Sequence, residues 1–168
     1  MNMTSIRQFN CDDFFKYNMV ELSDQPRCLA SPSLRPYLKW LSKFSEYFLV
    51  AESPNGDMMG YIMGEDEKNN HGVYDYGNVC LLVCSHFHRN IGTGTRLLES
   101  FERISKQKKL SYLNLHVQVI NSAAINLYKK FGFDVVDVIY DYYYYIKENE
   151  AYLMQKRLSR KRKHIQND

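Results

Sequence analysis

The chain lacks the features that mark several common protein classes. Its 168 residues include only four cysteines and no C-x-x-C pair, which argues against a zinc site or a redox dithiol. No apolar run reaches the length of a membrane span, and the first residues do not follow the basic-then-apolar order of a secretory signal. Internal repeats and low-complexity linkers are also missing. We therefore expect a single domain with no metal ion, reduced thiols and a cytoplasmic location, with the nucleus as the alternative.

Excess charge of one sign is confined to the end of the chain. The net charge is +3, yet the segment Lys156–His164, with the letters KRLSRKRKH, carries more positive charge than this total. We expect a folded domain over residues 1–158 and a basic, disordered tail over residues 159–168. The tail is interpreted as a solvated end, and its alternative role is an RNA-facing or nuclear-import patch. Because the body is close to neutral or slightly acidic, specific DNA binding is not expected.

Apolar periodicity predicts an α/β fold. Alternating or continuous apolar residues indicate strands, while apolar residues three and four positions apart indicate helices. Two polar segments, Ser23–Ser33 and Glu65–Tyr74, are predicted as loops. The expected strands are Ser5–Phe9, Phe48–Glu52, Met58–Met63, Val79–Cys84, Leu113–Val119, Phe133–Ile139 and Tyr152–Leu158. The expected helices are Asp12–Leu22, Leu34–Leu41, Thr95–Lys108 and Ser122–Phe131, with Gly132 as the stop of the last one.

The segment Arg89–Thr95 is the most informative motif. Its letters RNIGTGT follow the spacing R-x-x-G-x-G, between an apolar strand and a segment of helical spacing. A tight glycine loop in this position directs several backbone N–H groups at one point, at the positive end of a helix dipole. This arrangement predicts an anion site, most simply for a phosphate. The alternative is a glycine turn that only begins a helix, because short glycine patterns recur by chance.

The same loop resembles the pyrophosphate loop of the GNAT family of N-acetyltransferases, which hold acetyl-coenzyme A. Longer windows resemble the catalytic subunits of N-terminal acetyltransferases. Met3–Asp24 and Phe44–Gly64 are similar to the NatB subunit, whereas Leu113–Leu158 is more similar to the NatE subunit. The resemblance implies the GNAT fold, a mixed central sheet of about seven strands with helices on both faces.

The resemblance also implies an activity. A NatB-type enzyme moves acetyl from acetyl-CoA to the α-amine of nascent chains that begin Met-Asp, Met-Glu, Met-Asn or Met-Gln. Its implied partners are nascent polypeptide N-termini, a helical-repeat auxiliary subunit and the ribosome, with no membrane. The NatE alternative acts on Met followed by an apolar residue. The chain departs from the NatB pattern at Asp24–Ser33, and Ser85–His88 replace the proline and arginine that usually precede the glycine loop.

Two other interpretations remain open. One is a lysine or small-amine acetyltransferase of the same fold, because fold does not fix substrate. The other is a non-catalytic subunit that binds acetyl-CoA. Paired tyrosines in the final hairpin argue against the first, because a closed loop over the peptide entrance leaves little room for a lysine within a chain. The second is opposed by the presence of the residues expected to support activity, which are Arg89, Gly92, Gly94, His116 and Tyr128.

Cofactor binding is expected from the glycine loop, the strand before it and the following helix. Strand N–H groups would bond the pantetheine arm and the acetyl oxygen that becomes the oxyanion. Asn121 is predicted to cap a helix, and the resemblance adds a hydrogen bond to the pantetheine. The expected cofactor-binding residues are Leu82, Val83, Cys84, Arg89, Asn90, Ile91, Gly92, Thr93, Gly94, Thr95, Asn121 and Tyr128.

Two side chains are candidates for catalysis. The attacking α-amine must be neutral, and because its pKa is about 8, a mild base is needed near neutral pH. His116 is the predicted base because it lies on the polar face of its strand with Asn114 and Gln118. The alternative is a histidine that forms a hydrogen bond at the strand edge and has no part in catalysis. Tyr128 is predicted to protonate the leaving thiolate, and its alternative role is that of a core aromatic.

Peptide binding is expected from two distant parts of the chain. Glu21 and Leu22 end the first predicted helix and would border the substrate pocket. The resemblance implies that Tyr142 and Tyr143, in the final hairpin loop, bind the peptide backbone. The tyrosines that flank this pair are interpreted as packing or rim residues. The alternative for the whole cluster is the stabilisation of an exposed hairpin by cross-strand pairs.

Overall fold

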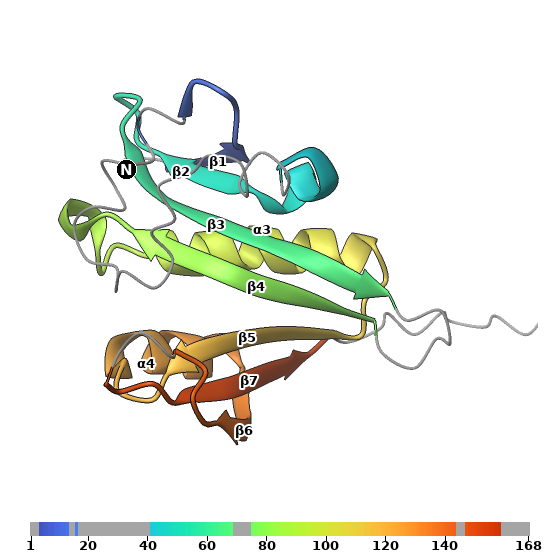
Figure 1. The fold of residues 1–168 in the computed structure, drawn as a ribbon. Helices are drawn as coiled ribbons and strands as arrows, with labels where there is room; N and C mark the ends of the chain where they lie inside the picture. Colours follow the sequence, from blue (N-terminus) through green and yellow to red (C-terminus); the bar gives the residue numbers. More distant parts are fainter. Residues whose placement is uncertain (1–3, 14–15, 17–40, 69–74, 144–146, 159–168) are drawn as a thin grey trace, which may run out of the picture.

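The computed structural model describes residues 4–13, 16, 41–68, 75–143 and 147–158, which build a mixed sheet with helices packed against it (Figure 1). The seven strands follow the order β1-β2-β3-β4-β5-β7-β6. The strands are β1 Ser5–Gln8, β2 Leu49–Glu52, β3 Met58–Lys68, β4 Asp75–Cys84, β5 Tyr112–Gln118, β6 Asp134–Ile139 and β7 Ala151–Arg157. The helices bounded within the described residues are α3 Thr93–Gln107, α4 Ser122–Phe131 and the short 3-10 helices η1 Ser45–Tyr47 and η2 His86–His88.

One neighbouring pair in this sheet differs from the others in its relative direction. All neighbouring strands are antiparallel except β4 and β5, which are parallel over Tyr76–Val79 and Tyr112–Leu115. Beyond these residues the two strands diverge (Figure 1). A parallel pair needs a crossover connection, which α3 supplies, and β7 then enters between β5 and β6. The seven-stranded mixed sheet confirms the predicted fold class.

Alternating residues build an apolar core on each face of the sheet. On one face, Leu97 and Phe101 of α3 are fully buried, and Ile125 and Tyr128 of α4 belong to the same cluster. The strand backbone makes room for the aromatic ring of α3, because a Cβ on Gly64 would lie 2.5 Å from Phe101 Cε2. Glycine is therefore required at this point for α3 to pack closely on β3.

The opposite face carries a second buried cluster. It includes Val50 and Tyr61, and Leu41 from the helical stretch 41–44 packs against it. Most of the two helices predicted before residue 41 lies outside the described residues. The predicted substrate-binding residues Glu21 and Leu22 lie outside them as well.

One loop prediction is wrong. The segment Glu65–Tyr74 is predicted as a loop, but β3 continues into it as far as Lys68. Glu67 faces Tyr76 of β4, and its carboxylate accepts a hydrogen bond from the Tyr76 hydroxyl. The continuation of β3 is polar at every position, so no alternation marks it as a strand. Cross-strand pairing decides its structure instead.

Predicted signals at helix ends and turns are confirmed. Asn121 caps α4, where its Oδ1 accepts a hydrogen bond from the Ala124 N–H at 3.1 Å. Gly132 ends the same helix with a φ of 95°, in the left-handed region that favours glycine. Gly56 has a φ of 83° in the β2–β3 turn, and its N–H bonds the Ser53 carbonyl oxygen at 3.0 Å. The β2–β3 turn and α4 therefore start and stop where local chemistry predicts.

Candidate active site

The glycine loop connects β4 to α3 through η2. Gly92 is the N-cap residue of α3, with a φ of 87°, and no side chain caps the helix. The Arg96 N–H bonds the Gly92 carbonyl oxygen at 3.0 Å, so α3 begins at Thr93 rather than at the predicted Thr95. A Cβ on Gly92 would meet no atom within 4 Å, so there is open space in front of the helix. The N–H groups of the first turn are therefore available to an anion.

The second glycine of the motif has a packing role. A Cβ on Gly94 would lie 3.1 Å from Leu127 Cδ2 and 3.5 Å from Cys84 Sγ, so the bare residue lets α3 approach α4 and β4. Thr93 is buried as well, and its hydroxyl donates to the His88 carbonyl oxygen at 3.3 Å. Gly94 has no side chain and the Thr93 hydroxyl is already bonded, so the backbone is what these two positions offer to a ligand.

The first part of the motif is more exposed. Asn90 has a φ of 60°, a left-handed conformation that asparagine tolerates better than most residues. Ile91 leaves 59% of its surface in solvent. Arg89 lies close enough to Cys84 for its charge to affect that thiol. The loop thus places one cation and one apolar side chain ahead of Gly92.

β4 carries open backbone groups where it separates from β5. The Ser85 N–H bonds the Met59 carbonyl oxygen of β3 at 2.9 Å. Because bonding alternates along an antiparallel strand, the N–H groups of Leu82 and Cys84 point away from β3, while that of Val83 points toward it. The register with β5 ends before these residues, so this geometry is compatible with the backbone role predicted for Leu82 and Cys84. The Val83 N–H points toward β3, so it does not fit the predicted role in cofactor binding.

His116 lies on β5 with its side chain on the face opposite α3 and α4. The side chain is half-buried, and burial lowers the pKa of the imidazole below its usual value. Its ring stacks on that of Tyr142, with centroids 4.4 Å apart and an interplanar angle of 15°. Among the described residues, its ring nitrogens have no hydrogen-bond partner. A neutral imidazole with a free nitrogen can accept a proton, which is the chemistry predicted for this residue.

The β6–β7 connection brings the predicted peptide-binding pair over β5. The rings of Tyr142 and Tyr143 meet edge to face, with centroids 4.9 Å apart. The Tyr143 N–H bonds the Asn149 carbonyl oxygen at 2.9 Å, and Gln118 Nε2 of β5 donates to the Glu148 carbonyl oxygen at 3.2 Å. The first bond closes the connection on itself, and the second fastens it to the strand that carries the predicted base. Residues predicted for two separate roles are thus neighbours.

Tyr128 reaches the same region from α4. It is buried, and its ring meets that of Phe133 edge to face at 5.9 Å. Burial raises the pKa of its hydroxyl well above the usual range, and the nearby Cys84 and Tyr143 raise it further. The hydroxyl can therefore donate a hydrogen bond to a developing thiolate. Complete proton transfer to a thiolate would be unfavourable, because an ordinary thiol has a pKa of about 8.5. The packing role and the donor role are compatible.

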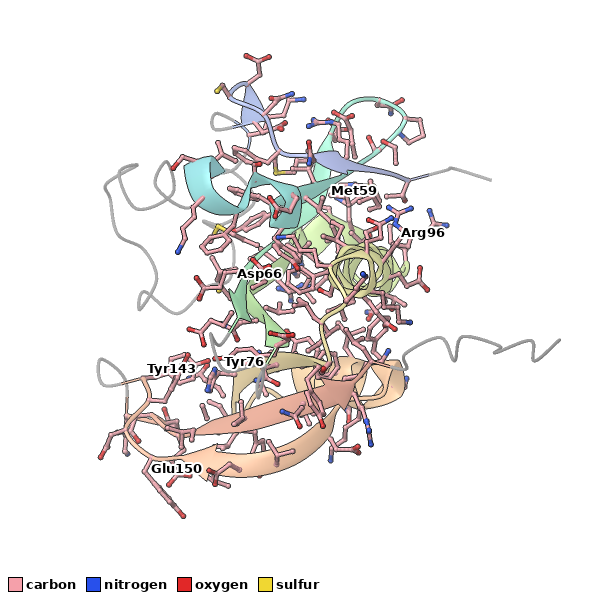
Figure 2. The ribbon with its side chains drawn as sticks, turned by 90° about the vertical axis from the view of Figure 1, so that its right-hand side faces the viewer. Met59, Asp66, Tyr76, Arg96, Tyr143 and Glu150 are labelled. Atoms are coloured by element: carbon pink, nitrogen blue, oxygen red, sulfur yellow. The ribbon has the colours of Figure 1, made fainter. Side chains whose placement is uncertain are left out.

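The candidate residues approach from both faces of the sheet. In Figure 2, α3 with Arg96 lies to the right of β3 and β4, and Tyr143 lies at the left of the view. The pairing of β4 with β5 stops at Val79 and Leu115. The carboxyl-terminal parts of the two strands are therefore not paired with each other, and they lie between the glycine loop and the tyrosine pair. A ligand at the glycine loop and a peptide at the tyrosine pair would meet there.

Two features near the site are missing from the sequence-based prediction. One is the stacking of His116 on Tyr142, which joins distant segments and has no local pattern. The other is a bulge in β4. Leu81 faces Met63, but Val79 faces Gly64, so one extra residue lies between them. Since β4 is apolar at nearly every position here, no break in alternation reveals the bulge.

The thiols beside the site are poor nucleophiles. Burial raises the pKa of Cys80 to about 12, and the charge of Glu65 adds to the effect. Burial likewise raises the pKa of Cys84 to about 11, against the opposing charge of Arg89. Both thiols therefore stay protonated at neutral pH and do not supply a thiolate.

Neither a metal site nor a membrane span is found in the part of the chain that the structure describes. There, no group of three or more His, Cys, Asp and Glu side chains is placed to hold a metal ion. Within the same residues, no helix has the length and apolar character needed to cross a membrane.

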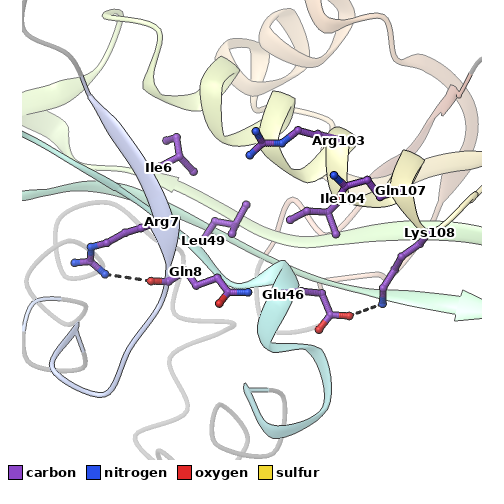
Figure 3. Close-up of a pocket in the computed structure, with 9 residues that line it drawn as sticks. All are labelled: Ile6, Arg7, Gln8, Glu46, Leu49, Arg103, Ile104, Gln107 and Lys108. Carbon is purple, nitrogen blue, oxygen red and sulfur yellow. Dashed lines mark hydrogen bonds and ion pairs between the residues drawn. The ribbon is translucent and has the colours of Figure 1, made fainter.

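A groove of about 510 Å³ lies away from the candidate site, between β1 and the second half of α3 (Figure 3). Two of its cations already have partners. Arg7 bonds the carboxylate of Asp13 at 2.7 Å, and Lys108 forms ion pairs with Glu46 and Asp66. The groove contains none of the predicted site residues, so no role in the chemistry follows from it.

Comparison with known proteins identifies relatives of this arrangement. Residues 5–133 match the model of the acetyltransferase (GNAT) family. The chain is 35% identical over 159 residues to N-alpha-acetyltransferase 20 of Dictyostelium discoideum, covering 94% of this chain and 88% of that protein. It is 32% identical over 159 residues to the N-terminal acetyltransferase B complex catalytic subunit NAA20 of Arabidopsis thaliana, covering 94% and 87%. A solved structure of the NatB acetyltransferase complex bound to CoA and MES matches with a TM-score of 0.79 and 26% identity, over 93% of this chain and 100% of the matched chain.

Proposed function

Because this chain belongs to the acetyltransferase (GNAT) family, we propose that it is a protein N-terminal acetyltransferase of the NatB type. It transfers acetyl from acetyl-CoA to the α-amine of the first residue of a protein. The observation that carries the proposal is the open N-terminus of α3 behind Gly92. Because no side chain caps the N–H groups of this turn, the pyrophosphate of acetyl-CoA can accept their hydrogen bonds.

The rest of the cofactor would follow β4 toward its divergence from β5. The N–H groups of Leu82 and Cys84 point into this region, where one can bond the pantetheine arm and the other the acetyl oxygen. Charge develops on that oxygen in the transition state, so a fixed donor there accelerates the reaction. Asn121 uses its Oδ1 for the cap of α4, which leaves its amide N–H groups for the pantetheine.

The chemical step needs a proton acceptor and a donor. The α-amine nitrogen forms a bond to the thioester carbonyl carbon, and the C–S bond then breaks. His116, which burial keeps neutral, would take the proton of the amine directly or through a water. Tyr128 would donate a hydrogen bond to the departing thiolate of CoA. The two groups thus stabilise the positive and negative charges that the reaction creates.

The proposed substrates are N-termini that begin Met-Asp, Met-Glu, Met-Asn or Met-Gln. Tyr142 and Tyr143, whose rings meet edge to face, would hold the peptide backbone on the face opposite α3. The NatB relatives are named as a complex or as the catalytic subunit of one. By the same likeness we propose a helical-repeat auxiliary subunit for this chain and action on nascent chains at the ribosome, in the cytoplasm.

The test is where the acetyl group goes. A peptide that begins Met-Asp and contains one internal lysine is incubated with acetyl-CoA and the chain, alone and with a NatB auxiliary subunit, and fragment masses locate the modification. We expect acetyl on the α-amine, and none with the Gly92→Asp variant. Acetyl on the lysine alone would point to a lysine acetyltransferase, and no transfer under either condition would point to a non-catalytic subunit. Either result would overturn the proposal.

A further inference from the structure

Three large apolar side chains are exposed where the chain leaves β4 and β5. Phe87 of η2 is 88% exposed, and Ile91 and Ile120 are each 59% exposed. Phe87 and Ile91 flank the start of the glycine loop, and Ile120 directly precedes the cap of α4. Exposed apolar side chains that gather at one place mark surfaces that a ligand or partner covers.

The strand directions place all three side chains at the same end of the sheet, where β4 and β5 have their carboxyl termini. β4 and β5 are parallel, so the loops that follow their carboxyl ends lie on the same side (Figure 1). In open α/β sheets, ligands bind outside the carboxyl ends of the strands. The exposed apolar side chains therefore border the site proposed for the pyrophosphate, rather than a remote part of the surface.

The chemistry of acetyl-CoA explains what such a surface could bind. Beyond the pyrophosphate, the molecule continues into an adenosine that carries a flat, neutral purine ring. The N–H groups at the start of α3 suit phosphate oxygens, but a purine needs an apolar or aromatic face. Aromatic side chains stack on nucleic acid bases with a sequence-tolerant gain in affinity. Phe87 offers such a ring, and the neighbouring ring of His86 meets it edge to face at 5.9 Å.

We propose that Phe87 and Ile91 form an adenine platform, an apolar surface on which the purine of acetyl-CoA stacks. The inference rests on the proposed function, since pyrophosphate at the glycine loop is what brings the adenosine beside these residues. Open volume is present next to the loop. Ile91, His88 and Arg96 line one side of a pocket of about 410 Å³, and the β2–β3 turn lines the other. Phe87 does not line this pocket, and its exposed ring would carry the purine outside it.

Other exposed apolar side chains give a contrast. Val136 and Tyr140, in and after the edge strand β6, are 52% and 71% exposed. They lie in a different strand and its following turn, away from the glycine loop, so they have no phosphate site beside them. Truncation at β6 is therefore a matched control for truncation at Phe87.

The experiment compares two ligands by calorimetry. Acetyl-CoA contains the adenosine, whereas S-acetyl-4′-phosphopantetheine keeps the acetyl arm and one phosphate but lacks it. We expect Phe87→Ala to weaken acetyl-CoA binding roughly 5- to 100-fold and to leave the affinity for the shorter ligand unchanged. Phe87→Trp should bind acetyl-CoA at least as tightly as the unmodified chain, and Val136→Ala should change neither affinity. Circular dichroism checks that each variant is folded, which an 88% exposed side chain should not affect.

The outcomes separate this inference from the proposed function. If the unmodified chain binds acetyl-CoA and Phe87→Ala binds it equally well, the adenine platform is wrong and the exposed ring is left for a protein partner. An equal loss for both ligands would also overturn it, because Phe87 would then act on the shape of the loop. If the unmodified chain binds neither ligand, the proposed function itself fails.

Discussion

The glycine loop and the β6–β7 connection border the same candidate site, but they hold their shapes by different means. The loop relies on backbone conformation, with Asn90 and Gly92 in the left-handed region and no side-chain cap on the helix. The described part of the connection also has one left-handed residue, Asp141, and one backbone bond, from the Tyr143 N–H to the Asn149 carbonyl oxygen, but it adds contacts between side chains. Tyr142 stacks on His116, and Asn149 Nδ2 donates to the carboxylate of Asp141 at 2.6 Å.

This difference explains what each part can do. Backbone N–H groups suit phosphate oxygens, which occur on every acetyl-CoA molecule, so the loop needs no particular side chain at its centre. The aromatic connection covers one face of a titratable group, the imidazole of His116, and so limits its contact with water. Substitutions that add a side chain should therefore disrupt the loop, whereas substitutions that remove a side chain should disrupt the connection.

The largest effect on activity is expected from removal of His116, the proposed base that the β6–β7 connection covers. His116→Ala should lower kcat roughly 10²- to 10⁴-fold near neutral pH, because the α-amine loses its proton acceptor. The loss should shrink at high pH, where the amine is already neutral. Steady-state rates over a range of pH give the measurement. Unchanged kcat at every pH would show that another group or bulk water takes the proton.

The loop should fail when a side chain is added. Gly92→Asp places a negative charge where the pyrophosphate is proposed to lie, and it strains a φ of 87°. Like charges at a binding site cost several kcal/mol, so we expect acetyl-CoA affinity to fall at least about 100-fold in calorimetry. Gly56→Asp is the matched control, since Gly56 has a φ of 83° and a Cβ there would also meet nothing within 4 Å. Equal affinities in the two variants would remove the phosphate assignment.

A smaller effect is expected when only the stacked ring is removed. Burial lowers the pKa of His116, so the base is neutral above that lowered pKa and activity falls as the pH drops through it. Tyr142→Leu should admit water, raise this pKa toward its ordinary value of about 6.5, and move the acid limb of kcat to higher pH. Tyr142→Phe keeps the ring and should leave the acid limb in place. If both variants shift it equally, the hydroxyl rather than the ring acts on His116.

The smallest predicted effect concerns a helix cap near both regions. Asn121→Ala removes the side-chain oxygen that accepts the Ala124 N–H. Unfolding in urea should show a loss of about 0.5–2 kcal/mol in stability. Asn121→Asp keeps the oxygen that caps the helix but loses the amide N–H donor. It should therefore preserve the free energy of unfolding while weakening the binding of acetyl-CoA. If Asn121→Asp binds acetyl-CoA normally, the amide does not contact the pantetheine.

The contrast between the two regions also explains what the sequence could predict. The loop was predictable because local chemistry determines it, with glycines at set spacing between a strand and a helix. The cap at Asn121 and the stop at Gly132 are local in the same sense. The contact of His116 with Tyr142 depends on how β5 and β6–β7 come together, which no local pattern describes. The extension of β3 to Lys68 was missed for the same reason, because only pairing with β4 makes that polar segment a strand.

The central claim is that this chain acetylates N-termini of the NatB class, and the most direct measurement is kcat/KM for peptides that differ only at position two. The assay uses Met-Asp, Met-Asn and Met-Leu peptides with acetyl-CoA, in the presence and absence of a NatB auxiliary subunit. A pocket that hydrogen-bonds a polar side chain rejects an apolar one strongly, because its own polar groups would be left unpaired. We therefore expect Met-Asp and Met-Asn to exceed Met-Leu clearly. A preference for Met-Leu under both conditions would contradict the NatB assignment and favour a NatE-type enzyme.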